Sequence, residues 1–507
     1  MTSLPALLIS FAVIGLIFSL LTRMAKRTKN LFLTFLQHFC GVWFIFSGLV
    51  KAVDPIGTAY KMEDYFAQFE NTFAGLNNIF ADIAPVFPWL SAYSNGFAIF
   101  MIVLEIVLGI MLIIGFSRRL TAWLFLLIVV FFTFLTGFTY LTGFVPTEAN
   151  FFDMAKWGPW VETQMRVTDC GCFGDFILLS PRTSFFKDLG LLIPSVVFLL
   201  YSKQMHQLFT RKGRNVFVGL STVVTLLFCL QNTYMDLPVV DFRPFKTGTN
   251  IRERKALEEE ARGNIEITGW VMENKNTGEI KKIMVPLERY KEVTAQCPPN
   301  EGWKVKDQIK TEPYVEKDGK RIVVKETKIS NFDIEDADNN EIADQILEEP
   351  GYTLMVIAYH FYGEKKTETF VVQDTTWASD TLRITADSFE LRPKVTGIAP
   401  RKVEIQTFVP EPGYGKLFGD KINPLAEAAS KAGWKVFAIN TFQDAEVAES
   451  FRRKVGADYP FYRADDKLLK TIIRSNPGIV VLKDGAVMGM YHWRHFPKPE
   501  ILLGKFK

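Results

Sequence analysis

Cysteine is scarce in this chain, and its distribution limits the chemistry that each part can perform. Five cysteines occur in 507 residues, which is too few for a disulfide-stabilised scaffold. None follows Cys297, so the C-terminal part cannot exchange disulfides with thiols of its own. The chain also lacks a phosphate-binding glycine loop, a hydrolase triad and a convincing metal-ligand spacing. Its net charge of +3 gives no indication of nucleic-acid binding.

Apolar residues, in contrast, are abundant. The chain is 48% hydrophobic and 14% aromatic, yet 22% of its residues are charged. These averages combine two unlike parts, because the chain is apolar with short polar breaks up to about Met235 and has the composition of a soluble protein beyond it. We therefore expect one membrane domain followed by one or two soluble domains, each large enough for its own core.

Six apolar runs approach the length that crosses the hydrocarbon core of a bilayer. They cover approximately residues 4–21, 31–53, 97–115, 120–144, 185–201 and 216–235. The first run is expected to remain as a span and not to be a cleaved signal peptide. Its basic residues follow the apolar stretch, and no small-residue cleavage site is apparent.

Basic residues follow the first, third and fifth runs, so every second connection is positively charged. These residues are Arg23, Lys26, Arg27, Lys29, Arg118, Arg119, Lys203, Arg211, Lys212 and Arg214. The positive-inside rule predicts that these connections are cytoplasmic and that the N-terminus and everything after Met235 lie on the opposite face. In a bacterium the protein would lie in the inner membrane, and that face would be the periplasm, where a disulfide can persist.

The connection between the fourth and fifth runs contains the sequence Asp169-Cys170-Gly171-Cys172-Phe173-Gly174-Asp175. The orientation above places it on the periplasmic face. A single glycine between two cysteines lets the sulfurs meet only in a small ring, and strained disulfides tend to be labile and oxidising. Cys170 and Cys172 are therefore candidate redox residues. A structural bridge, or two thiols that only pack, remains the alternative.

Ionisable residues inside the apolar runs are the second candidate site. Each costs about 3 kcal/mol at a helix centre, so each needs a partner or a function. Glu105 lies in the middle of the third run, His38 lies in the second, and Lys51 is near the outer end of the second and could extend to the interface. Glu105 is thus a candidate catalytic carboxylate at a proton or quinone-head-group site. The alternative is a buried Glu105 that is hydrogen-bonded or ion-paired to a neighbouring helix.

Residues 30–200 resemble the DoxX and MauE families of four-helix membrane proteins. The resemblance rests on the stretch from Phe44 to Pro55, on Glu105 with Gly109 in the next run, and on the Cys170 loop. It implies a role linked to thiol, disulfide or quinone chemistry; it fixes no cofactor, and quinone is the candidate. The chain lacks the helix-borne Cys-x-x-Cys of disulfide-generating enzymes of the vitamin K reductase type.

After a charged linker, alternating patterns predict a β-rich segment with hairpins at residues 265–285 and 314–325. From Tyr352 the pattern changes to alternating strands and helices, which indicates an α/β arrangement. Strands are expected at residues 352–361, 435–440 and 479–482 and in a stretch that ends at Tyr491, and helices at residues 417–432, 445–455 and 468–474.

Pro477, just before a buried strand, resembles the cis-proline of thioredoxin-like domains of the periplasmic TlpA and peroxiredoxin-related branch. A working thioredoxin carries Cys-x-x-Cys after its first strand, whereas this chain has a long insertion there, at about residues 363–414. The domain is therefore expected to be redox-inactive. Asn476, Pro477 and Gly478 are candidate partner-binding residues, because an extended peptide could pair with the backbone beside them.

The sequence thus predicts a multi-domain membrane protein. Residues 1–30 are expected to form a first transmembrane helix and a basic loop, and residues 31–235 a DoxX/MauE-like membrane domain. Residues 236–350 are expected to form a periplasmic linker and β-rich segment, and residues 351–507 a thioredoxin-like domain. We favour a subunit or assembly factor of a bacterial envelope complex that docks a periplasmic or membrane protein. The alternative is a membrane thiol-disulfide oxidoreductase component that uses Cys170 and Cys172 and is linked to quinone. The sequence leaves open whether the protein is an enzyme.

Overall fold

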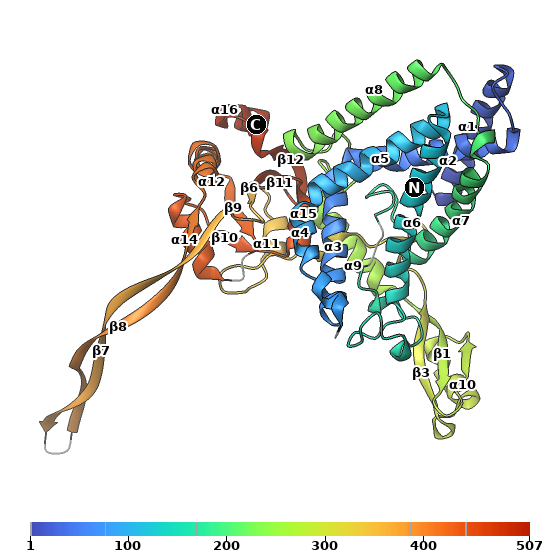
Figure 1. The fold of residues 1–507 in the computed structure, drawn as a ribbon. Coiled ribbons are helices and arrows are strands. Elements are labelled where there is room, and N and C mark those ends of the chain that lie inside the picture. Colours follow the sequence, from blue (N-terminus) through green and yellow to red (C-terminus); the bar gives the residue numbers. More distant parts are fainter. Residues whose placement is uncertain (1–2, 77, 168–170, 386–387, 442–443, 507) are drawn as a thin grey trace. The chain divides into compact units, whose positions relative to one another are not determined.

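The structure is a computed structural model that describes residues 3–76, 78–167, 171–385, 388–441 and 444–506. The chain forms two compact units, residues 1–242 and 243–507. Figure 1 shows that the first unit is helical and that the second combines helices with strands.

Within the described residues, six helices of the first unit are long and apolar enough to cross a membrane. They are α1 (Leu4–Met24), α2 (Leu31–Val53), α5 (Ser94–Ile114), α6 (Arg118–Thr142), α7 (Pro181–Leu200) and α8 (Arg211–Leu230), which a π-helical turn extends to Met235. Each has 20 to 25 residues, which matches the thickness of the hydrocarbon core. The six predicted runs are therefore confirmed as helices, with ends that move by a few residues.

Polar residues at the helix ends explain where these helices begin. The side chain of Asn30 accepts the N–H of Leu33 at the start of α2, and Ser180 accepts that of Thr183 at the start of α7. Asp54 ends α2 and caps the following helix, α3 (Pro55–Ala74), which begins with a proline. Shorter helical segments complete the unit at Ile79–Ile83, Val86–Ala92 (α4), Met154–Lys156, Glu162–Gln164 and Ser202–Gln204.

Glycines let α2 and α5 pack backbone to backbone. A Cβ atom added at Gly109 of α5 would lie 2.7 Å from the carbonyl oxygen of Gly41 in α2, and one at Gly48 would lie 2.4 Å from the side chain of Ile106. Small residues at such crossings are the usual means by which membrane helices approach closely. This contact fixes the rotation of both helices and, with it, the position of the polar residues that they carry.

The second unit begins with α9 (Ile251–Gly263), followed by a three-stranded antiparallel sheet with the order β2-β1-β3. Its strands are β1 (Ile267–Asn274), β2 (Ile280–Ile283) and β3 (Trp303–Lys310), and α10 (Tyr290–Gln296) packs beside them. A separate hairpin pairs β4 (Tyr314–Lys317) with β5 (Lys320–Val323). Both hairpins expected in this segment are present.

A mixed five-stranded sheet with the order β10-β9-β6-β11-β12 forms the centre of the second unit. Strands β6 (Tyr352–Ile357), β9 (Lys435–Asn440) and β10 (Phe461–Arg463) are parallel to one another. Strands β11 (Gly478–Lys483) and β12 (Ala486–His492) continue the sheet in antiparallel fashion. The helices of this unit are α11 (Ala343–Leu347), α12 (Pro412–Leu417), α13 (Asn423–Lys431), α14 (Ala445–Lys454), α15 (Asp466–Ile472) and α16 (Pro499–Lys505).

The insertion after β6 is a long two-stranded antiparallel ribbon, for which the sequence reasoning assigned no structure. It consists of β7 (Gly363–Thr385) and β8 (Ser388–Pro410), of 23 residues each, and projects away from the sheet (Figure 1). Its root joins the core, where Phe408 packs with Phe361 and Phe451. The predicted helix at residues 417–432 is also divided, because a π-helical turn at Phe418–Ile422 separates α12 from α13.

Candidate functional site

A cavity of about 50 Å³ lies within the helical unit. Residues of α2, α3, α5, α6 and α7 line it, together with Gly171 and Cys172 of the loop before α7. Its walls combine apolar and aromatic side chains, among them Trp43, Phe44 and Phe132, with a small number of charged groups. A mainly apolar lining with a few converging polar groups is typical of sites that bind small molecules.

The first charged pair in this cavity joins α2 to α5. The ammonium of Lys51 lies 2.7 Å from a carboxylate oxygen of Glu105, and both side chains are buried. The same ammonium lies 4.8 Å from the centre of the Phe132 ring. The expectation that Lys51 extends to the membrane interface is therefore wrong, because Glu105 holds it between the helices. The alternative proposed for Glu105, an ion pair with a neighbouring helix, is the arrangement found.

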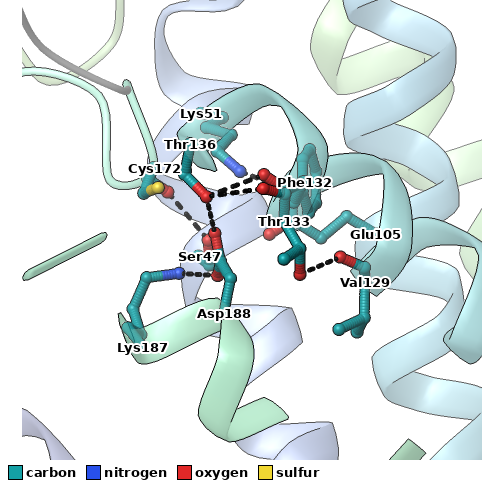
Figure 2. Close-up of polar contacts among 10 residues, drawn as sticks. All are labelled: Ser47, Lys51, Glu105, Val129, Phe132, Thr133, Thr136, Cys172, Lys187 and Asp188. Atoms are coloured by element: carbon teal, nitrogen blue, oxygen red, sulfur yellow. Dashed lines mark hydrogen bonds and ion pairs between the residues drawn. The ribbon is translucent and has the colours of Figure 1, made fainter. Parts of the chain in front are cut away.

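A second charged pair lies on α7, as Figure 2 shows. Lys187 contacts the carboxylate of its neighbour Asp188, which also accepts a hydrogen bond of 3.0 Å from the hydroxyl of Thr136 on α6. The side chains of Lys187 and Asp188 are 8% and 2% exposed. Sequence reasoning missed both residues, because they lie close to the start of the fifth run, where charged residues are common. The sequence could have revealed them, because both residues follow Ser180, the N-cap of the helix, and therefore lie inside it.

The loop before α7 brings a thiol to this cavity. Cys172 lines the cavity, and its backbone carbonyl accepts a hydrogen bond of 2.9 Å from the hydroxyl of Ser47 on α2 (Figure 2). Burial raises the pKa of the Cys172 thiol, and the neighbouring ammonium of Lys187 offsets this only in part. The thiol is therefore protonated at neutral pH. Cys170, the other member of the predicted pair, lies outside the described residues.

His38 is not part of this cavity lining and belongs to a separate polar cluster. It lies 13 residues before Lys51 on the same helix, which corresponds to about 20 Å along the axis. Its ring centre is 4.6 Å from that of His206, and its Nδ1 lies 3.0 Å from the hydroxyl of Ser19 on α1. The structure therefore does not bring His38 and Glu105 together in one site.

The candidate partner-binding residues lie in the second unit and are less accessible than the sequence suggested. The Asn476–Pro477 peptide bond is cis. Pro477 is buried, and Gly478 is the first residue of the interior strand β11. The side chain of Asn476 accepts the N–H of His360 at 3.2 Å and donates to its carbonyl at 2.6 Å, so it connects this loop to the segment that follows β6.

Metal binding finds no support in the part of the chain that the structure describes, where no group of three or more His, Cys, Asp or Glu side chains could hold an ion. The cavity residues offer different chemistry. Three ammonium groups, two carboxylates, four hydroxyls and one thiol line an aromatic and aliphatic interior. Such a site can hold the polar head of a lipophilic molecule by hydrogen bonds and place it beside a thiol.

One family model matches the chain, that of DoxX, over residues 31–138. The matched region runs from the start of α2 almost to the end of α6, so it contains Lys51, Glu105 and Thr136 but neither Cys172 nor the charged pair of α7. No curated protein and no solved structure matches the chain. The six apolar helices and this match identify a membrane protein with a DoxX-like helical region.

Proposed function

Starting from the DoxX match, we propose that this membrane protein binds a quinone-class molecule in the cavity of its helical unit and uses it to oxidise Cys170 and Cys172. The main support for this proposal is that four buried charged side chains and the Cys172 thiol line one cavity. A MauE-like role in disulfide formation agrees with this arrangement. The absence of a helix-borne Cys-x-x-Cys is then no obstacle, because a loop supplies the thiol.

The proposed reaction balances as a two-electron exchange. The two thiols lose two electrons and two protons and form one disulfide, while the quinone gains both and becomes a hydroquinone. The ammonium groups of Lys51 and Lys187 are the donors that would hold the quinone oxygens. Carboxylates next to them, on Glu105 and Asp188, would accept the protons that leave the thiols and pass them to the reduced quinone. The aromatic walls would contact the ring and the lipophilic tail.

The proposed setting is the bacterial inner membrane, with the Cys170 loop on the periplasmic side. The basic connections after α1, α5 and α7 support this orientation, because such loops remain in the cytoplasm. The loops at the other ends of these helices, and the chain after Met235, would then face an oxidising compartment. A disulfide formed at Cys170 and Cys172 could persist there until a substrate thiol attacks it.

The redox step can be tested with the full chain in detergent. The protein is reduced, the reductant is removed, and a short-chain ubiquinone is added without oxygen. We expect two thiols per chain to disappear for each hydroquinone formed, with complete loss of the reaction in Cys172→Ser. The matched control is Cys297→Ser, which removes a buried thiol of the second unit and should react like the unchanged chain. Equal hydroquinone formation by Cys172→Ser would refute the proposal.

Quinone binding is a separate arm of the test. Replacing Lys187 by methionine keeps the length of the side chain and removes a charge-assisted hydrogen bond, so we expect about tenfold weaker quinone binding. Lys212→Met at the exposed start of α8 should bind as before. If both variants bind quinone like the unchanged chain, the cavity is not the binding site.

A second candidate function is docking by a subunit or assembly factor of an envelope complex. The observation that favours it is the β7/β8 ribbon, which exposes Val371, Trp377 and Ile398 to 64%, 62% and 61%. We also interpret the five-stranded sheet as thioredoxin-like from its strand order and directions. Such a domain without cysteine would bind a periplasmic or membrane protein and perform no exchange.

Crosslinking in intact membranes tests the docking role. Replacing Trp377 and Ile398 by serine should remove a crosslinked protein that the unchanged chain captures, because both side chains contribute apolar contact area. Serine at Ile322 and Val323 is the matched control, since these residues are 47% and 48% exposed on β5. If both double variants capture the same protein, the ribbon is not its docking surface.

A further inference from the structure

One end of the helical unit carries basic side chains and no carboxylate. We call it the basic end and define it as residues 23–30, 115–119 and 201–214, which contain ten lysines and arginines and no aspartate or glutamate. Hydrogen bonds join its three segments. The ammonium of Lys29 donates to the carbonyl of Lys203 at 3.2 Å, and the N–H of Leu208 donates to the carbonyl of Ile114 at 2.9 Å.

Residues 206–208 close the C-terminus of α5. Gly115 has a φ of +66°, and a Cβ atom there would meet the carbonyl oxygen of His206 at 2.0 Å, so the two segments touch backbone to backbone. The Nε2 of His206 donates to the carbonyl of Ile113 at 2.8 Å, and the side chain of Gln207 donates to that of Gly115 at 3.1 Å. The last carbonyls of the helix are thereby satisfied, as the burial of Ile114 and Gly115 requires.

This arrangement leaves one ring nitrogen of His206 without a hydrogen bond within the part of the chain that the structure describes. The residue is fully buried, and Nδ1 has no hydrogen-bond partner among the described residues. Because Nε2 carries the proton that the Ile113 carbonyl accepts, Nδ1 of the neutral ring is an acceptor. Burial lowers the pKa of His206, the hydrogen bond to Ile113 opposes this, and the charge of Arg118 lowers it further. The ring is therefore neutral at pH 7.

Arg118, whose charge acts on His206, provides a second unused nitrogen. Its Nε is buried and has no hydrogen-bond partner in the described part of the chain. Arg118 is also the first residue of α6, whose N-cap residue Ser117 makes no side-chain capping bond. Arg214, which donates to the carbonyls of Leu208 and Phe209, repels the Arg118 guanidinium. Positive charge and free donors thus coincide at a helix N-terminus.

We propose that the turn at Arg118 binds the phosphate of an anionic phospholipid headgroup. The phosphate oxygens would accept from the Arg118 guanidinium and from the free N–H groups at the start of α6. A headgroup hydroxyl, as in phosphatidylglycerol, would donate to Nδ1 of His206. Membrane orientation alone explains why these loops are basic, but it does not explain a buried guanidinium nitrogen and a buried imidazole nitrogen without partners.

The test measures thermal unfolding of the full chain in detergent during titration with lipid or phosphate. Phosphatidylglycerol should raise Tm at concentrations at which phosphatidylcholine does not. Arg118→Gln should need about tenfold more phosphatidylglycerol for the same shift, because it removes a charge-assisted contact. Arg119→Gln changes the net charge equally at the exposed neighbouring position and should respond like the unchanged chain.

Three other outcomes of this titration would contradict parts of the proposal. If inorganic phosphate alone gives the full shift, the ligand is a free phosphate and the lipid assignment is wrong. If Arg118→Gln and Arg119→Gln lose the same amount, general attraction to a basic face accounts for binding and no built site exists. His206→Phe keeps a planar ring without Nδ1, and it should weaken the response to phosphatidylglycerol while leaving the response to phosphatidic acid, which lacks the glycerol hydroxyls, unchanged. Equal effects on both lipids would remove His206 from the site.

Discussion

At the scale of single residues, the buried Lys51–Glu105 pair is the feature with the clearest energetic consequence. Glu105→Gln would leave the Lys51 ammonium without its carboxylate in a water-poor interior, which should cost about 3 to 5 kcal/mol of stability. The double variant Lys51→Met/Glu105→Leu should lose less, because no charge remains buried. Thermal unfolding of the purified chain in detergent measures both. A double variant less stable than Glu105→Gln would contradict this account.

Glu258 on α9 gives a prediction about pH. Its side chain is 1% exposed, and burial tends to raise its pKa, but hydrogen bonds from Ser330, Thr327 and Arg254 outweigh burial and lower it. A carboxyl whose folded pKa is depressed stabilises the fold above its unfolded pKa, near 4.5, and loses this contribution as pH falls below that value.

Glu258→Gln should therefore cost about 1 to 3 kcal/mol at pH 7. The difference from the unchanged chain should shrink as the pH falls through 4.5 and below. Thermal unfolding at a series of pH values measures this difference. Glu259→Gln, at the exposed neighbouring position, is the control and should differ little at any pH. A Glu258→Gln penalty that is the same at pH 7 and at low pH would show that ionisation is not involved.

At the scale of elements, the contact between α2 and α5 depends on Gly109. An added Cβ would lie 2.7 Å from the carbonyl oxygen of Gly41 and 2.9 Å from the backbone nitrogen of Ile45, and backbone atoms cannot yield unless the helices separate. Gly109→Ala should therefore destabilise the chain by about 1 to 3 kcal/mol. Gly219→Ala on α8, where the added atom meets open space, should be neutral or stabilising by up to about 1 kcal/mol. Melting curves of the two variants test this contrast.

The elements also show where sequence patterns suffice. Six apolar runs and the strands around residues 352–357, 435–440 and 478–492 were predictable, because length and local polarity are properties of contiguous residues. The β7/β8 ribbon was not predicted. Its strands mix charged, threonine and apolar residues, and most of the side chains described on them are exposed, so the alternation that marks a half-buried strand is weak. The two strands are held together by antiparallel backbone pairing along their length.

At the scale of the whole molecule, orientation in the membrane is the property that all proposed functions share. A reporter protein fused after Arg214 should be active only as a cytoplasmic reporter, and one fused after Asp236 only as a periplasmic reporter, because the helix between these points is long and apolar enough to cross the membrane. Activity of a periplasmic reporter after Arg214 would reverse the orientation and remove the oxidising compartment from the redox proposal.

The sequence by itself determined the apolar runs that are long enough to span a membrane, the basic connections, the absence of cysteine after Cys297 and the need of Glu105 for a partner or a function. These follow from composition and from the cost of charge in hydrocarbon. Only the tertiary structure decided that Lys51, 54 residues away, is that partner, that Lys187 and Asp188 line the same cavity, and that His38 lies elsewhere. The reason is that packing decides which helices are neighbours and how each is rotated, as the close approach at Gly109 does for α2 and α5. Local sequence does not encode which helix faces contact one another.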